Sequence, residues 1–237
     1  MLQDDVVSTG YIFPPLQPNT VPILLNQQRF PIRRVFCVGR NYAEHAKEMG
    51  ANPERGTRPV FFTKPADAVV ADGLSTRYPS ATANLHFEVE LVIALHSGGE
   101  NIAIDQALSH VFGYAVGNDL TRRDLQLEAK NAGLPWDISK AFDQSAAISA
   151  IATTANIGHP TAGAITLDVN GIRRQQADIA DLLWSVPEII HELSKLFCLS
   201  AGDLIFTGTP AGVGALVRGD LVSARINGVG ELSHGIC

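Results

Sequence analysis

Cysteine is scarce in this sequence of 237 residues, and the three that occur (Cys37, Cys198 and Cys237) show no Cys-x-x-Cys spacing. An odd number of cysteines without that spacing argues against a disulfide framework and against a zinc ribbon. The seven histidines show no His-x-x-x-His pattern either, so the alternative of a zinc hydrolase finds no support in the spacing. The scarcity of cysteine favours the reducing cytoplasm as the location of the protein.

The sequence also lacks a run of basic residues and an apolar run long enough to cross a membrane. Its formal net charge is −6, which makes nucleic acid an improbable partner. The acidic residues Asp4 and Asp5 stand where a secretory signal would be basic. We therefore expect a cytoplasmic protein without a membrane or nucleic-acid partner. A small anionic substrate is compatible with this charge, because a site can be locally positive on an acidic protein.

What the sequence does contain is typical of a globular enzyme-sized domain. Hydrophobic residues make up 46% of the chain and charged residues 18%. The length suits one domain, and no internal repeat is visible. The first 30 residues are rich in proline and predict an irregular arm with one short strand. We expect this N-terminal arm over residues 1–30 and a single folded domain over residues 31–237.

The pattern of apolar residues predicts more strand than helix. Two Asn-Gly pairs, at 170–171 and 227–228, are typical of tight hairpin turns. Helices are expected at 41–49, after Thr121 and after Ser185, the last two because Thr121 with Asp124 and Ser185 with Glu188 have capping-box spacing. Strands are expected at 35–38, 86–95, 111–116, 204–207 and 221–226. Helices do not alternate with these strands, so we predict a mainly β, α+β fold.

Acidic residues occur in an unusual place on the strand expected at 86–95. His86, Glu88 and Glu90 are spaced by two, so on a strand they share one face. The strand then continues as Leu-Val-Ile-Ala-Leu, which places the glutamates at the mouth of a covered sheet. Two carboxylates about 5 Å apart repel by roughly 3 kcal/mol at an effective dielectric near 20. A buried pair is therefore protonated or bound to a cation, whereas an arbitrary Glu-x-Glu pair is more often solvated on a half-exposed strand.

A third carboxylate, Asp119, ends the apolar strand that begins near Val111. Three carboxylates form an all-oxygen set, which selects a hard divalent ion, Mg²⁺ or Mn²⁺, over zinc. About three octahedral positions would stay open for water or substrate. Asp119 could equally cap the helix that follows it, so the spacing leaves both interpretations open.

Seven runs of sequence resemble the fumarylacetoacetate hydrolase family, in the right order over about residues 31–237. Within that family they are most similar to the bacterial fumarylpyruvate hydrolases and the related acylpyruvases. The runs are CVGRNYAEHAKEMG (37–50), FFTKPADAVV (61–70), HFEVELVIAL (86–95), GYAVGNDLTRRDLQ (113–126), GLPWDISKAFD (133–143), NGIRRQQ (170–176) and GDLIFTGTPAGVG (202–214). The resemblance implies a catalytic domain with a mixed β-roll or pseudo-barrel and a few short helices.

The resemblance also implies roles for individual residues. Glu88, Glu90 and Asp119 would bind Mg²⁺, with Mn²⁺ as the alternative ion, and His45 with Glu48 would form a catalytic dyad. Lys140 would assist catalysis, while Arg123, Gln126 and Thr209 would contact the substrate. Without the resemblance, His45 and Glu48 read as solvated neighbours on an exposed helix, Lys140 as a surface lysine and Arg123 as the partner of an acidic residue. The TGTP turn around Thr209 lacks the Gly-Lys-[Ser/Thr] of a phosphate loop, which argues against a nucleotide site.

The implied activity is hydrolysis of a carbon–carbon bond in a ketonic substance. The expected substrate is a small anionic 2-oxo acid, fumarylpyruvate, which would give fumarate and pyruvate in a gentisate-type route of aromatic catabolism. The alternatives are an oxaloacetate decarboxylase or tautomerase, another acylpyruvase, and a non-catalytic protein that binds a metal or a metabolite. The family further implies a homodimer, and the polar loop 51–59 beside the dyad is expected to act as a lid.

Overall fold

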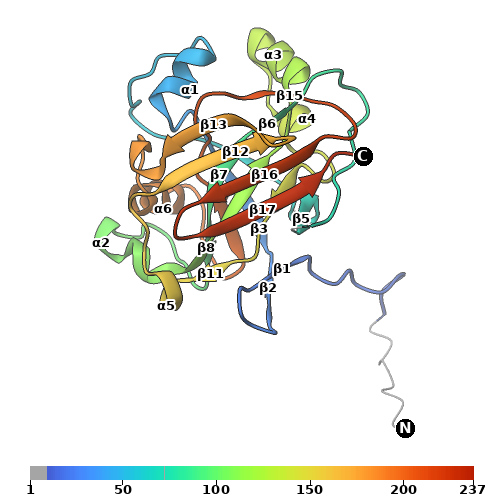
Figure 1. Cartoon of the computed structure of the whole chain (residues 1–237). Helices are drawn as coiled ribbons and strands as arrows, with labels where there is room; N and C mark the ends of the chain where they lie inside the picture. The colour runs from blue at the N-terminus through green and yellow to red at the C-terminus, as the bar shows by residue number, and fades with distance from the viewer. Residues whose placement is uncertain (1–9, 72) are drawn as a thin grey trace.

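The computed structural model describes residues 10–71 and 73–237, which include most of the expected N-terminal arm. The part of the expected arm before residue 10 lies outside the described residues. Where one short strand was expected, the structure has two, β1 (Thr20–Pro22) and β2 (Arg29–Pro31), which pair antiparallel. Figure 1 shows residues 10–19, which precede β1, extending away from the body of the molecule. Val21 and Phe30 on the two strands are buried in the core, so the arm is anchored from β1 onward.

A mixed sheet of eight strands forms the centre of the fold. Its order is β4-β3-β14-β7-β8-β10-β5, and β11 pairs with the far end of β8. Two neighbouring pairs, β14 with β3 and β10 with β5, are parallel, and the others are antiparallel. The strands are β3 (Arg34–Gly39), β4 (Val60–Lys64), β5 (Val69–Ala71), β7 (Val89–Leu95), β8 (Val111–Asp119), β10 (Ala146–Ile148), β11 (Ala152–Thr153) and β14 (Asp203–Phe206).

A second sheet of four antiparallel strands packs on this centre. Its order is β13-β12-β16-β17, and its strands are β12 (Ala164–Val169), β13 (Ile172–Asp178), β16 (Leu221–Ile226) and β17 (Gly230–Gly235). Figure 1 shows it lying across β7 and β8. Leu167 and Ala224 of this sheet share one buried cluster with Leu91 and Ile93 of β7. The mainly β, α+β fold with a curled mixed sheet is thereby confirmed.

Both Asn-Gly pairs form the expected turns. Asn170 and Gly171 connect β12 to β13 with φ angles of 53° and 75°. The second pair, Asn227-Gly228, connects β16 to β17. At 170–171 asparagine tolerates the positive φ and glycine has no Cβ to clash, so these two residues specify the turn locally. The second connection is one residue longer: Ile226 pairs with Gly230, and of the Asn-Gly pair only Gly228 has a positive φ, of 78°.

The strand expected at 86–95 is interrupted at Glu88, so that expectation is wrong at one residue. β6 (Leu85–Phe87) belongs to a separate three-stranded sheet with β9 (Thr121–Arg122) and β15 (Gly214–Leu216), whereas β7 begins at Val89. The Glu88 backbone N–H donates to Oδ1 of Asn118 at 2.8 Å instead of to a strand. His86 therefore does not join the two glutamates: its ring nitrogens contact Asn84 and Arg123.

The helices are short and lie at the edges of the sheets (Figure 1). They are α1 (Ala43–Glu48), α2 (Ile104–Ala107), α3 (Arg123–Ala132), α4 (Asp137–Lys140), α5 (Thr154–Ile157) and α6 (Val186–Ser194), with 3₁₀ turns η1 (Ala66–Ala68), η2 (Leu108–His110) and η3 (Ile179–Asp181). Within the described ranges, none is long and apolar enough to cross a membrane.

One of the two expected capping boxes is present and the other is not. Ser185 and Glu188 cap α6 reciprocally, as predicted. Thr121 instead lies in β9, and α3 begins two residues later at Arg123. The Asp124 carboxylate accepts hydrogen bonds from Thr82 Oγ1 and the Ala83 N–H. It therefore binds a loop that is distant in sequence and does not form the expected capping box with Thr121.

Candidate active site

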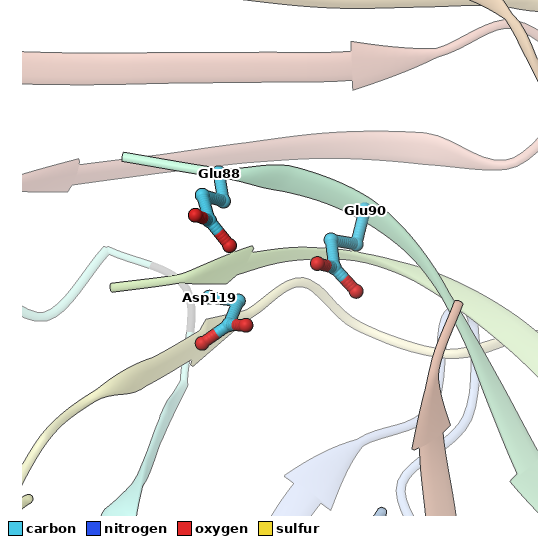
Figure 2. A group of neighbouring side chains, drawn as sticks. All are labelled: Glu88, Glu90 and Asp119. Atoms are coloured by element: carbon cyan, nitrogen blue, oxygen red, sulfur yellow. The ribbon is translucent and has the colours of Figure 1, made fainter. Parts of the chain in front are cut away.

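Three carboxylates meet at one end of the β7–β8 pair. In the antiparallel register Glu90 lies opposite Gly117 and Val89 opposite Asn118, so the start of β7 adjoins the end of β8. Glu88 precedes β7 and Asp119 is the last residue of β8. One oxygen from each carboxylate lies within 4.8 Å of the others, and all three residues are buried. Figure 2 shows their carboxyl groups turned toward a common space.

Buried cations surround this cluster of carboxylates. Lys140 Nζ lies 2.7 Å from Glu88 Oε2 and 2.6 Å from Asp119 Oδ2. Arg123 pairs with the other oxygen of Glu88, and Lys64 Nζ lies 2.8 Å from Asp119 Oδ1. Within the described chain, Glu88 and Asp119 therefore both have cationic partners.

Glu90 is the carboxylate without a counter-charge. Within the described chain it forms no ion pair, and its Oε2 accepts a hydrogen bond from the Gly208 N–H at 2.7 Å. Burial, followed by the charges of Asp119 and Glu88, raises the pKa of Glu90 well above its usual value. Burial also opposes the ionisation of Glu88, but Lys140 and Arg123 outweigh it and lower the pKa of that residue. The cluster thus contains two ion-paired carboxylates, Glu88 and Asp119, beside a third, Glu90, which is either protonated or bound to a cation.

The donor atoms of this cluster fit a hard divalent ion. All three side chains offer oxygen, the ligand that Mg²⁺ and Mn²⁺ prefer. Across residues 10–71 and 73–237, no donor is aligned for a hydrogen bond with Asp119 Oδ1, although Lys64 Nζ lies at ion-pair distance. Burial and then the charge of Asp119 raise the pKa of the Cys37 thiol on β3, so this cysteine offers no thiolate that would favour zinc.

His45 and Glu48 form a hydrogen-bonded pair on α1. His45 Nδ1 lies 3.1 Å from Glu48 Oε2, and Glu48 Oε1 accepts a hydrogen bond from the Gly212 N–H at 3.1 Å. The carboxylate thus ties the histidine to the loop that follows the TGTP turn. An Nδ1–H that donates to Glu48 leaves Nε2 as the acceptor. Burial lowers the pKa of His45, although Glu88 and Glu48 oppose that shift, so the neutral imidazole prevails near pH 7.

The residues expected to contact substrate lie around one small cavity of about 30 Å³. Arg123 Nη1 donates to Gln126 Oε1 at 2.5 Å, while other atoms of its guanidinium contact Glu88 and His86. The cavity is lined by Val38, Gly39, Arg40, His45, Met49, Phe62, Glu88, Glu90, Asp119, Arg123, Gln126, Lys130, Trp136, Lys140 and Thr209. Glu48 supports this wall through His45 and does not line it.

Four further residues, which the sequence did not indicate as functional, hold the site together. Lys64 pairs with Asp119, and Gln175 on β13 donates to Thr209 Oγ1 and to the Pro210 carbonyl, both at 2.8 Å. Asn118 holds the Glu88 backbone N–H, and its amide nitrogen lies 2.9 Å from His234 Nε2. Lys64 and Gln175 lie in the runs FFTKP and NGIRRQQ, which carry the family resemblance, but the resemblance assigned no role to either residue.

The loop expected as a lid, residues 51–59, has no regular secondary structure, as predicted. Arg55 fastens it to the body: its Nη2 lies 2.7 Å from Glu188 Oε1 on α6, and its guanidinium lies 3.7 Å from the centre of the Trp184 ring. These contacts hold the loop in the position that the structure shows, and a lid motion would have to break them.

Comparison with known proteins defines the class to which this fold and site belong. The family model described as the C-terminal domain of fumarylacetoacetate hydrolase matches residues 34–237. The chain belongs to the fumarylacetoacetate hydrolase family. One similar protein is the fumarylpyruvate hydrolase of Ralstonia sp, which is 42% identical over 186 residues. The alignment covers 78% of this chain and 96% of that protein. The mitochondrial oxaloacetate tautomerase FAHD1 of Rattus norvegicus is 42% identical over 197 residues, or 83% of this chain and 88% of that protein.

A solved structure with the same architecture contains Mn²⁺ and pyruvate. The crystal structure of fumarylpyruvate hydrolase from Pseudomonas aeruginosa in complex with Mn²⁺ and pyruvate is 52% identical in sequence. It superimposes with a TM-score of 0.93 and covers 95% of this chain and 98% of its own. A buried acidic group in this chain and Mn²⁺ in that relative together support divalent-metal binding within the fold.

Proposed function

We propose that this chain hydrolyses the carbon–carbon bond of a 2,4-dioxo acid, with fumarylpyruvate as substrate and fumarate and pyruvate as products. The family and its relatives support a 2,4-dioxo acid hydrolase or an oxaloacetate tautomerase. The observation that carries the hydrolase is the position of His45, a buried imidazole that lines the same cavity as the three carboxylates. A general base beside a cation site suits the activation of water next to a chelated 2-oxo acid.

Glu88, Glu90 and Asp119 are the residues that would hold Mg²⁺, with Mn²⁺ as the alternative. When bound, a divalent ion supplies Lewis-acid stabilisation for negative charge on the 2-oxo group of the substrate. Glu90 provides the charge that lacks a partner, and Lys64, Lys140 and Arg123 neutralise the rest. Lys140, placed between Glu88 and Asp119, also brings an ammonium group to the enolate oxygen that develops during cleavage.

We assign to His45 the removal of a proton from the attacking water. Its Nε2 accepts a proton from the water that attacks the C4 carbonyl, while Glu48 holds Nδ1 and stabilises the resulting imidazolium. The C3–C4 bond then breaks, and its electron pair becomes the enolate of pyruvate, which is protonated at C3. Arg123, Gln126 and Thr209 are assigned to orient the oxygens of the substrate, because their side chains line the cavity.

The family resemblance also leads us to propose a pathway, a compartment and an oligomeric state. A gentisate-type route of aromatic catabolism would supply fumarylpyruvate, the cytoplasm would be the compartment, and the enzyme would act as a homodimer. Pyruvate release from fumarylpyruvate, acetylpyruvate and oxaloacetate, measured side by side, tests the choice of substrate. We expect the two 2,4-dioxo acids to be cleaved well and fumarylpyruvate best. Much faster pyruvate release from oxaloacetate would reject the hydrolase and favour the decarboxylase. Tautomerisation releases no pyruvate, so the tautomerase alternative is tested by following the enol form of oxaloacetate directly.

The pH dependence of hydrolysis follows from the pKa of His45. The base must be neutral to accept a proton, so activity is present above the pKa of His45 and lost as pH falls through it. Burial lowers that pKa from 6.5, and we therefore expect the acidic limb of kcat/KM below pH 6.5. Glu48→Gln removes a hydrogen bond and a charge that raise the pKa, so the limb should move to still lower pH while the plateau falls. A limb that moves to higher pH in this variant would contradict the assignment.

A further inference from the structure

Two cationic side chains line the active-site cavity without an anionic partner among the described residues. Arg40 follows β3 directly, and Lys130 lies in the last turn of α3. Lys64, Lys140 and Arg123 are each paired with a carboxylate of the cluster. Over the described ranges, neither Arg40 nor Lys130 forms an ion pair or a side-chain hydrogen bond. The cavity therefore has two positive side chains that are not paired with any carboxylate of the cluster, in addition to the three cations that pair with Glu88 and Asp119.

The backbone around Arg40 is held in an uncommon conformation. Arg40 has a φ of 59°, a left-handed conformation that costs energy for a side chain with a Cβ. Gly39 precedes it, and a Cβ at that glycine would lie 3.3 Å from Cζ3 of Trp136. The chain thus passes close beside the indole and turns at the arginine. Such strain persists where the surrounding structure enforces it, which is common at ligand sites.

Lys130 is half-buried in a positive environment. Its Nζ lies 5.5 Å from the centre of the Trp136 ring, a cation–π distance. Burial lowers the pKa of Lys130, and the charges of Arg123 and Arg40 lower it further. Arg40 is exposed and Lys130 is half-buried, so solvent screens their repulsion only in part, and an anion that binds between them would relieve it.

We infer that Arg40 and Lys130, beside the Trp136 ring, form a subsite for a second carboxylate at the acyl end of the substrate. The inference rests on the proposed function and narrows its substrate class to 2-oxo acids whose acyl group ends in a carboxylate. Fumarylpyruvate has such a group beyond its double bond, and acetylpyruvate has none. In oxaloacetate the second carboxylate is attached to C3, the carbon that becomes the enolate, so it cannot reach a separate acyl subsite.

Binding of two inert analogues tests the subsite without catalysis. 2-Oxoheptanedioate and 2-oxoheptanoate have the same chain length and 2-oxo acid end, and differ in the second carboxylate. Neither has a 4-oxo group, so neither can be cleaved. With Mg²⁺ or Mn²⁺ present, calorimetry of the wild type should show about 10- to 100-fold tighter binding of the diacid, the range expected for hydrogen bonds to a charged group.

Three variants make the test specific. Lys130→Met and Arg40→Asn should each remove most of the preference for the diacid. The affinity for the monoacid should change by no more than about 3-fold in either variant. Asparagine is chosen at position 40 because it tolerates a positive φ. Lys195→Met is the matched control: Lys195 is exposed, pairs with Glu192 at 2.7 Å and lies outside the cavity, so the preference should persist.

The outcomes separate the subsite from the activity. Equal binding of both analogues by the wild type, or a preference that survives both cavity variants, would overturn the subsite. Equal loss of both analogues in both variants would also overturn it, because the two residues would then support the 2-oxo acid end or the fold. If the preference depends on Arg40 and Lys130 but fumarylpyruvate is not cleaved, the subsite stands and the proposed hydrolysis fails.

Discussion

Replacing Glu90 with glutamine is expected to raise the melting temperature of the metal-free protein and to abolish the further rise that Mg²⁺ or Mn²⁺ gives the wild type. The pKa of Glu90 is raised by burial and by its acidic neighbours. A carboxyl group whose pKa is higher in the folded state stabilises the fold at low pH, and that stabilisation is lost as pH rises through the folded pKa. Glutamine resembles the protonated acid, so at neutral pH it removes a penalty in the absence of metal.

The matched variant Glu88→Gln should have the opposite effect on the metal-free protein. Lys140 and Arg123 lower the pKa of Glu88, so its ionised form stabilises the fold above the unfolded pKa and this contribution is lost as pH falls. Removing one partner of a buried ion pair costs about 3–5 kcal/mol when the other charge is left uncompensated. In Glu88→Gln that charge is Arg123, because Lys140 keeps its ion pair with Asp119. Both variants lose a metal ligand, and each should weaken binding by more than the ~10- to 100-fold that loss of a supporting residue causes.

Thermal unfolding with a chelator and with excess metal measures both effects in one series. A ligand that binds the folded state raises the melting temperature by mass action, so loss of that rise reports loss of binding. Metal analysis of the wild type should find Mg²⁺ or Mn²⁺. Zinc bound by histidines, or an undiminished metal response in both variants, would reject the carboxylate site.

The parts of this site that the sequence predicted are those encoded by short-range spacing. Glu88 and Glu90 are two residues apart, and their side chains do meet, as the strand pattern indicated. The hairpins at both Asn-Gly pairs were also predicted correctly, and at 170–171 the turn conformation depends on the two residues themselves. Asp119 was placed at a strand end by the apolar run before it, and the register of β7 with β8 then brings it to the glutamates.

The parts that the sequence did not predict depend on the tertiary fold. Nothing near Lys64 in the sequence indicates that its ammonium reaches Asp119 across the site, and the amide of Gln175 comes from the second sheet. The break at Glu88 has the same origin, since Asn118 on β8 competes for its backbone N–H. Alternation alone predicts a continuous strand there, because it contains no information about a hydrogen-bond partner that lies 30 residues away.

His45→Ala should lower kcat for hydrolysis of fumarylpyruvate by about 100- to 10,000-fold, the usual contribution of a general base. Decarboxylation of oxaloacetate needs stabilisation of the enolate but no activated water, because its leaving group is carbon dioxide. Any decarboxylase side activity should therefore fall far less in the same variant. Glu90→Gln should damage both activities through the metal site, and Glu48→Gln should resemble a weaker form of His45→Ala because the imidazole loses its partner.

The measurement is kcat for both substrates in these three variants at saturating Mg²⁺, with His96→Ala as the control. His96 is exposed and lies outside the cavity, so its replacement should leave both activities unchanged. Thermal unfolding of His45→Ala establishes that the fold is intact. The ratio of the two activities is the decisive quantity, since a loss of folded enzyme or of metal lowers both together. If His45→Ala reduces both activities by the same factor, the residue supports the enolate or the fold, and water activation must be assigned to another group.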